Sequence, residues 1–209
     1  MSVLAPKVSA MTTQPGRARP TDADGFRAAW ALAEAEWAQT FARARSFSAQ
    51  QLHERVDGEW SFIQTQRHLV FATDAWVRRA LLGDPTPWHP LDLPHDDMED
   101  APGVPRDYAA RPTLDEVLAL RADRMATVRD VIAALTDEAL DSLTVPVLEP
   151  GYPESEAFLV RRCLGAVVNE EWEHRRFAER DLDIIDNGSR STDQTTETDQ
   201  PREEETTHG

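Results

Sequence analysis

Apolar residues recur every three or four positions in four long segments of this chain. The segments span about residues 22–45, 61–82, 113–135 and 154–185. This spacing places apolar side chains on one face of a helix, so each segment predicts an amphipathic helix with a buried face. The period-two alternation that is typical of strands is missing, and the sequence contains no internal repeat. The pattern therefore predicts an all-α fold, a four-helix bundle with long connectors.

Turn and capping residues mark the ends of these helices. Residues 113–116, Thr-Leu-Asp-Glu, form a capping box that begins the third helix. Residues 83–85, Gly-Asp-Pro, end the second helix, and residues 186–188, Asp-Asn-Gly, end the fourth. The connectors at residues 45–60 and 83–112 are long enough to permit a topology other than simple up-down.

The connector at residues 83–112 is rich in proline and acidic residues. Loops of this length inside a compact domain usually serve binding or catalysis. We expect the connector to cover a functional site. Four of its apolar residues should then be partly buried against the second and fourth helices: Trp88, Leu91, Leu93 and Met98.

Length and composition indicate one domain with two tails. A chain of 209 residues with 40% hydrophobic content is long enough for one domain with its own core, which we place at residues 21–186. Residues 1–20 have no apolar period and residues 187–209 are rich in Thr, Asp and Glu, so both ends are expected to be disordered. The single cysteine, Cys163, excludes an intrachain disulfide and falls among core positions, where a small buried side chain is expected.

The charge of the chain bears on its partners. A formal net charge of −16 repels nucleic acid and anionic membrane surfaces. No apolar run reaches the roughly 18 residues that cross a bilayer, and the N-terminus lacks an apolar signal segment. We therefore expect a cytoplasmic protein with neither nucleic acid nor a membrane as a partner. The oligomeric state stays open, and a homodimer is compatible with the sequence.

The fourth helix carries the clearest chemical signal, because Glu170 and His174 lie four residues apart beside its apolar face. Burying an ionised carboxylate is costly unless it is paired or bound to a cation. His68 in the second helix would complete a set of three nitrogen and oxygen ligands, the number typical of a catalytic zinc site with open positions. The expected site is a divalent metal ion held by His68, Glu170 and His174, with zinc favoured and nickel or iron as alternatives.

Simpler explanations and neighbouring residues compete with this site. His68 is also consistent with a core histidine that bonds to a neighbouring helix. Glu171, three residues from His174, is the alternative carboxylate. Arg121 lies among apolar residues of the third helix and needs an anion, either Glu171, Asp181 or a substrate carboxylate, of which an internal ion pair is favoured.

His95 is the remaining candidate. It lies in the acidic connector between Pro94 and Asp96. Histidines in such loops are usually solvated. If the connector folds over the site, His95 is placed to carry protons there.

Three short motifs carry a resemblance to a known family. Trp60-Ser61, Arg67-His68-Leu69 and Glu170-Glu-Trp-Glu-His174-Arg175 resemble the DinB-like superfamily, and within it the branch that includes mycothiol-dependent maleylpyruvate isomerase. The resemblance covers about residues 22–186. It implies a four-helix bundle that binds a divalent metal through a histidine on the second helix and a His-x-x-x-His or, in the isomerase branch, Glu-x-x-x-His motif on a later helix.

By position, that resemblance maps the implied ligands onto His68, Glu170 and His174. It also implies a low-molecular-weight thiol such as mycothiol or bacillithiol as cosubstrate, although many members of the superfamily have no assigned reaction. The expected function is a metal-dependent transferase or isomerase that uses such a thiol on a small electrophile. Two alternatives remain: a bundle that binds a metal or small ligand without turnover, and a metal-free bundle in which Glu170 pairs with a histidine.

Overall fold

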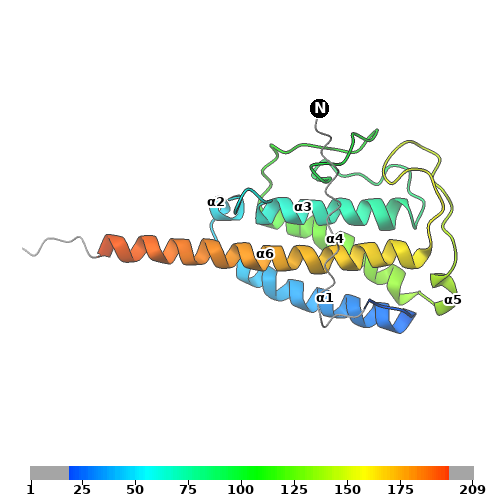
Figure 1. Ribbon diagram of the computed structural model, residues 1–209, viewed down its shortest axis with the longest axis horizontal. Helices are drawn as coiled ribbons and strands as arrows, with labels where there is room; N and C mark the ends of the chain where they lie inside the picture. The colour runs from blue at the N-terminus through cyan, green and yellow to red at the C-terminus, as the bar shows by residue number, and fades with distance from the viewer. Residues whose placement is uncertain (1–18, 198–209) are drawn as a thin grey trace, which may run out of the picture.

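The computed structural model describes residues 19–197, and these form an all-α bundle, as the apolar pattern predicts (Figure 1). The long helices are α1 (Ala23–Ala44), α3 (Phe62–Thr73), α4 (Leu114–Ala133) and α6 (Val160–Glu197). The π-helix η1 (Asp74–Arg79) continues α3, and α2 (Ala49–Leu52) and α5 (Asp137–Leu140) are single turns. Within residues 19–197 there is no β-strand, only an isolated bridge between Leu143 and Leu159.

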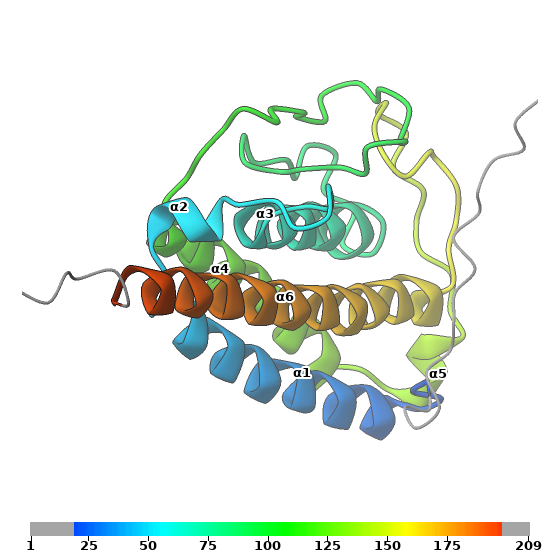
Figure 2. The same ribbon diagram turned by 60° about the vertical axis from the view of Figure 1, so that its left-hand side comes forward.

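The four long helices are arranged so that α1 and α3 each pack against both α4 and α6. Consecutive long helices α1 and α3 therefore lie across a diagonal of the bundle (Figure 2). The connector between them has to cross the end of the bundle, which explains its length. This is the departure from simple up-down order that the long connectors permit.

Side-chain caps explain where three of these helices begin. Asp22 accepts a hydrogen bond from the amide of Gly25 at the start of α1. Ser61 begins α3 and Thr113 begins α4, each with a reciprocal capping box to the residue three positions later. These bonds satisfy amides that have no partner inside the helix. The capping box predicted at residues 113–116 is confirmed.

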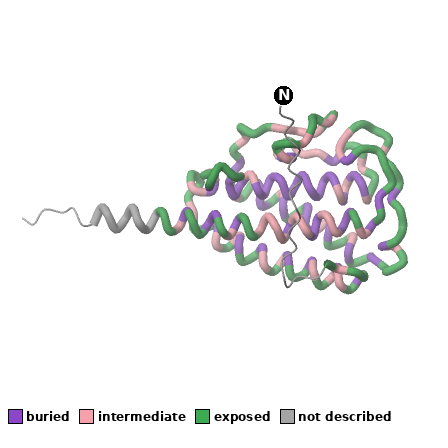
Figure 3. The backbone as a smooth tube through the Cα atoms, in the orientation of Figure 1, coloured by how far each residue is buried: buried purple, intermediate pink, exposed green. Residues whose placement is uncertain are grey.

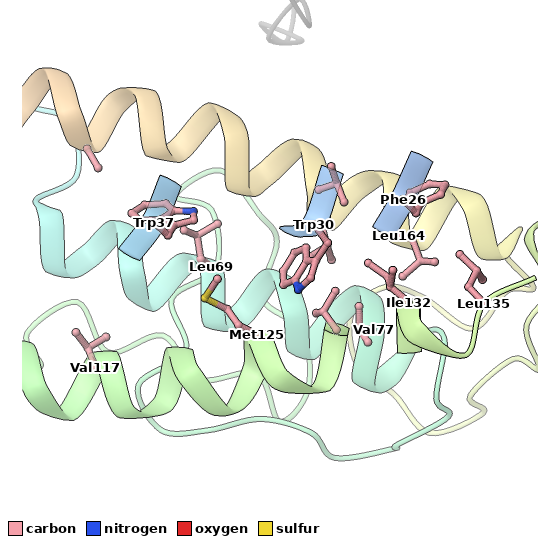
Figure 4. Packing of buried hydrophobic residues seen from close by; sticks show 14 of the residues in the cluster. Phe26, Trp30, Trp37, Leu69, Val77, Val117, Met125, Ile132, Leu135 and Leu164 are labelled. Carbon is pink, nitrogen blue, oxygen red and sulfur yellow. The ribbon is translucent and has the colours of Figure 1, made fainter. Parts of the chain in front are cut away.

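The hydrophobic core lies between the four long helices (Figure 4). Trp30 and Trp37 of α1 are fully buried, and Leu69, Met125 and Leu164 bring α3, α4 and α6 into the same cluster. Cys163 is a free and fully buried thiol, and burial raises its pKa to about 11. It is therefore a packing residue, as expected, because a protonated thiol in an apolar setting is a poor nucleophile.

Helix α3 is buried along almost its whole length (Figure 3). The cause is the connector 83–112, which lies over the side of α3 that faces away from the core (Figure 2). The expected burial of its apolar residues is observed: Leu93 is fully buried, and Trp88, Leu91 and Met98 are partly buried.

One arginine holds this connector on the bundle. Arg67 of α3 is fully buried and donates hydrogen bonds to the carbonyl oxygens of Leu91 (2.8 Å), Asp107 (2.6 Å) and Ala110 (3.3 Å). A buried guanidinium requires acceptors, and here the connector backbone supplies them. The connector is thus fixed as a cover over α3.

The structure corrects two helix boundaries. The fourth helix was expected from about residue 154, yet α6 begins at Val160, because Leu159 forms the bridge with Leu143. Its predicted stop at residues 186–188 is wrong, since α6 continues to Glu197. A glycine costs a helix about 1 kcal/mol, which lowers stability without forcing an end.

Of the expected disordered ends, residues 1–18 and 198–209 lie outside the described residues. None of the helices described is both long and apolar enough to cross a membrane.

Candidate metal centre

Two histidines from different helices meet at one carboxylate oxygen. The Oε2 atom of Glu170 lies 3.0 Å from Nε2 of His174 and 3.3 Å from Nε2 of His68. His68 comes from α3 and is fully buried, whereas Glu170 and His174 come from α6 with side chains 24% and 16% exposed. The structure therefore brings together the three residues selected from the sequence. Their binding of a metal stays a prediction.

A third histidine joins the cluster from the connector 83–112. One ligand atom each from His68, His95 and Glu170 lie within 4.8 Å of one another. The rings of His68 and His95 have centroids 4.5 Å apart. Sequence reasoning treated His95 as a solvated loop residue or a proton carrier, and missed it as a candidate ligand. The one available signal was the expectation that this connector covers the site.

The hydrogen bonds of His68 fix which of its ring nitrogens faces the cluster. Its Nδ1 atom lies 2.9 Å from the carbonyl oxygen of Leu93. A carbonyl oxygen can only accept, so we assign the ring proton to Nδ1. In a neutral ring Nε2 then presents a lone pair, and it points at the Glu170 carboxylate. Two acceptors that face each other require a proton or a cation between them.

The ionisation of these groups favours a cation at that position. Burial lowers the pKa of His68 to about 4, although the neighbouring Glu170 opposes this shift. Burial acts to raise the pKa of Glu170, but the contacts with His174, and after it with His68, outweigh burial and lower the pKa below its usual range. Near neutral pH the pair is thus a neutral imidazole beside an ionised carboxylate.

The donor atoms fit a divalent ion in type, and the pair formed by His68 and Glu170 also fits it in spacing. Zinc binds imidazole nitrogen and carboxylate oxygen at about 2.0–2.1 Å, so tetrahedral ligand atoms are about 3.3–3.4 Å apart. The separation of His68 Nε2 from Glu170 Oε2 is 3.3 Å. The proton on Nδ1 of His68, bonded to a backbone carbonyl, is the arrangement that commonly orients a metal-binding imidazole.

A pocket of about 300 Å³ opens beside the cluster, and both His95 and His174 line it. Trp60 forms part of its wall: its ring stacks on His174 with centroids 5.9 Å apart and an interplanar angle of 19°. The indole N–H of Trp60 donates to Asp96 at 3.3 Å. A small molecule in this pocket would therefore contact two of the candidate ligands directly.

Arg121 and Glu171 lie elsewhere, in the core. Their side chains are fully buried and form a bidentate ion pair, with N–O distances of 2.9 and 2.6 Å. Arg121 also donates to Gln66 at 3.2 Å. Glu171 is thus the anion that Arg121 requires, and it is unavailable to the histidine cluster. The carboxylate of the candidate centre is Glu170.

Fold and site together define a class: a four-helix-bundle protein with a histidine and glutamate cluster between two of its helices. The chain belongs to the DinB superfamily, whose family model matches residues 32–178. That match spans His68, His95, Glu170 and His174. Neither the curated proteins nor the solved structures contain a significant match to this chain.

Proposed function

We propose that this protein is a metal-dependent enzyme that binds one divalent cation, zinc by preference, through His68, Glu170 and His174. The observation that carries the proposal is the neutral, buried Nε2 of His68 facing an ionised Glu170 oxygen that His174 also contacts. A cation between these atoms relieves the repulsion of their lone pairs. His95 is positioned as a further ligand or as a proton carrier at the same place.

Access from the pocket supports catalysis rather than a purely structural ion. His95 and His174 both line the pocket, whose volume of about 300 Å³ suits a small molecule. A bound divalent cation supplies one kind of chemistry here, which is to lower the pKa of a thiol or water molecule in contact with it. The carbonyl oxygen of Leu93 fixes the ring of His68, and the ring of Trp60 packs against those of His68 and His174.

The substrate of the reaction that we propose is a small electrophile, and the cosubstrate is a low-molecular-weight thiol such as mycothiol. The thiol is either transferred to the electrophile or assists its isomerisation. Its support is the resemblance of the Glu170-to-His174 motif to the isomerase branch of the superfamily. The second candidate is metal or small-ligand binding without turnover. It is favoured by the contacts that Glu170 already makes with both histidines, which hold the cluster together without a substrate.

Thiol consumption tests the proposal. Untagged protein loaded with zinc is mixed with mycothiol and small electrophiles such as maleylpyruvate, and free thiol and electrophile are followed over time. We expect turnover that stops on chelation and is missing from His174→Ala. Metal binding without turnover would favour the non-catalytic candidate, and turnover that survives chelation would contradict the metal-dependent reaction.

A further inference from the structure

Of the four side chains at the candidate metal centre, only that of His95 comes from a connector rather than a helix. Its ring centroid is 4.5 Å from that of His68, and one of its ring nitrogens lies within 4.8 Å of ligand atoms of both His68 and Glu170. The His95 ring also stacks on Trp60, with centroids 6.4 Å apart. The connector therefore brings a third imidazole to the place where His68 and His174 meet Glu170.

The backbone on both sides of His95 is tied to the same centre. Two residues earlier, the carbonyl oxygen of the fully buried Leu93 accepts a hydrogen bond from Nδ1 of His68 at 2.9 Å. One residue later, Asp96 accepts a hydrogen bond from the indole N–H of Trp60 at 3.3 Å. His95 is thus held over the centre, but by a loop, which shifts more easily than a helix does.

The ring nitrogens of His95 are available to an ion. Other histidine rings of this chain are used to fix the backbone: Nδ1 of His89 accepts from a backbone amide, and Nε2 of His53 donates to a backbone carbonyl oxygen, each at 3.1 Å. Within residues 19–197 no such bond reaches the ring of His95, whose contacts there are with other aromatic rings. A neutral imidazole has one nitrogen that only accepts, and without a donor there it can bind a cation.

We propose that His95 is a fourth, exchangeable ligand of the ion, which the sulfur of the thiol cosubstrate displaces. This inference rests on the proposed function, because it requires both the ion and the thiol. His95 is the histidine suited to leave, since His68 is fully buried with its ring fixed by a backbone carbonyl and His174 is carried by the long helix α6. His95 borders the pocket, so a ligand that takes its place enters from there.

The exchange balances in atoms and charge. The bond between the ion and a ring nitrogen of His95 breaks, and a bond between the ion and sulfur forms. The proton of the S–H group moves to the nitrogen that is released, so no further base and no oxidant is required. Thiolate is the softer ligand and carries a charge, so it can replace a neutral imidazole on zinc. His95 thereby occupies one position of the centre at rest and accepts the thiol proton when the cosubstrate arrives.

Cadmium NMR tests this exchange. The 209-residue chain is labelled with ¹⁵N-histidine and loaded with ¹¹³Cd²⁺, whose coupling to ¹⁵N identifies the histidine ligands. We expect coupling to His68, His95 and His174. Mercaptoethanol, a small uncharged thiol, then serves as the probe. At saturation it should remove the coupling to His95 and leave the couplings to the two helix histidines.

One variant and its matched control assign the signal. His95→Asn should lack that coupling before thiol is added and should bind Zn²⁺ about tenfold more weakly than the wild type. The loss is smaller than for Glu170→Gln, because water can take the vacated position. His89→Asn makes the same change in the same connector, at a ring that accepts from a backbone amide, and should alter neither the couplings nor the affinity. Mercaptoethanol should bind more tightly to the His95→Asn centre, since no protein ligand has to leave.

The outcomes separate this inference from the proposed function. Identical couplings in the wild type and His95→Asn would overturn His95 as a ligand while leaving the other three ligands intact. A coupling to His95 that persists at saturating mercaptoethanol would overturn the exchange, and this titration uses the wild type, so it holds even if His95→Asn does not fold. If Cd²⁺ does not bind, or does not couple to His68 and His174, the proposed function is wrong and the inference falls with it.

Discussion

At the scale of single residues, the candidate metal centre depends on one oxygen atom. Oε2 of Glu170 is within 3.3 Å of both His68 and His174. The adjacent Glu171 pairs with Arg121 instead. Glu171, one position later, is rotated by about 100° around the helix and pairs with Arg121 in the core. Two neighbouring carboxylates therefore have separate tasks, one chemical and one structural.

Replacing the shared carboxylate should remove the ion. In Glu170→Gln the negative ligand is lost, so we expect the affinity for Zn²⁺ to fall by about 100-fold or more. Isothermal titration with competing chelators measures this change. Glu173→Gln makes the same chemical change on the same helix, at a residue that pairs with Arg176 at the surface, and should leave the affinity unaltered. Equal affinities for the wild type and Glu170→Gln would contradict the ligand assignment.

The core pair predicts a stability effect without a metal effect. Arg121→Met leaves Glu171 buried without its partner, so we expect a loss of about 3–5 kcal/mol in the free energy of unfolding. Adding Glu171→Leu should restore most of the loss, because an apolar pair replaces the ion pair. Denaturant unfolding of the single and double variants checks both steps. A loss below about 1 kcal/mol in the single variant would show that the pair is not buried as described.

A second buried carboxyl group predicts a dependence on pH. Burial raises the pKa of Asp92 well above its usual range, and the charge of Asp74 raises it further. Oδ1 of Asp92 receives no hydrogen bond, whereas Asp74 is held as a carboxylate by two bonds from Arg124, at 2.7 and 2.9 Å. Asp92 is therefore the group that keeps a proton and donates it to Asp74.

The sign of this effect follows from the raised pKa. The folded chain binds the Asp92 proton more tightly than the unfolded chain, so its stabilising contribution is complete at low pH and is lost as the pH rises through the folded pKa. Relative to Asp92→Asn, whose amide donates at any pH, the wild type should lose stability as the pH rises from about 4, the ordinary range of a carboxyl group, through the raised pKa of Asp92. Denaturant unfolding across this range measures the difference. Asp100→Asn, 95% exposed in the same connector, is the control, and a flat difference for Asp92→Asn would contradict the shared proton.

At the scale of elements, the connector 83–112 is as much a part of the candidate centre as the helices are. It supplies His95 and the carbonyl oxygen of Leu93 that orients His68. Arg67, the residue before His68, bonds to three carbonyl oxygens of the connector. The same turn of α3 therefore holds both the cover and the ligand beneath it.

Loosening this attachment should expose the connector before it unfolds the bundle. Arg67→Met removes the donor and leaves the carbonyls of Leu91, Asp107 and Ala110 without it, so limited proteolysis should cut within residues 83–112 faster than in the wild type. Zn²⁺ affinity should fall as His95 and Leu93 lose their positions. Arg129→Met, which breaks an exposed pair with Glu34, should change neither. Unchanged cleavage in Arg67→Met would contradict the role of this residue.

The helices could be predicted because their signals lie in residues close together in the sequence, whereas the position of the connector could not. The apolar periodicity, the Thr113 capping box and the Glu170-to-His174 spacing are all local patterns of this kind. The position of His95 depends on contacts with Arg67 and α3 that no local pattern encodes. The π-helix η1 was missed because one wider turn hardly changes the apolar pattern, and the end of α6 because glycine only weakens a helix.

At the scale of the whole molecule, the core and the candidate centre are separate. The core cluster is formed by apolar side chains such as Trp30, Leu69, Val128 and Leu164, and the buried ion pair of Arg121 and Glu171 does not involve the histidines. The bundle should therefore fold without an ion. Small structural zinc domains differ, since their metal contributes the folding free energy itself.

His174→Ala tests this separation. The substitution removes a candidate ligand that is partly exposed at the pocket, so we expect retained helicity and a cooperative thermal transition. Circular dichroism with and without a chelator makes the comparison. A chelator should lower the melting temperature of the wild type only by the amount that ligand binding contributes, and should leave His174→Ala unaffected. Loss of the helical signal on chelation would contradict the expectation that the apolar core is sufficient to stabilise the bundle without an ion.

The metal content of the untagged 209-residue chain decides whether one divalent ion is shared by His68, Glu170 and His174. It is measured by elemental analysis after loading with Zn²⁺ and removal of unbound ion. We expect one zinc per chain in the wild type and close to none in His174→Ala. A wild-type chain that retains no divalent metal, or a His174→Ala variant with undiminished zinc, would contradict it.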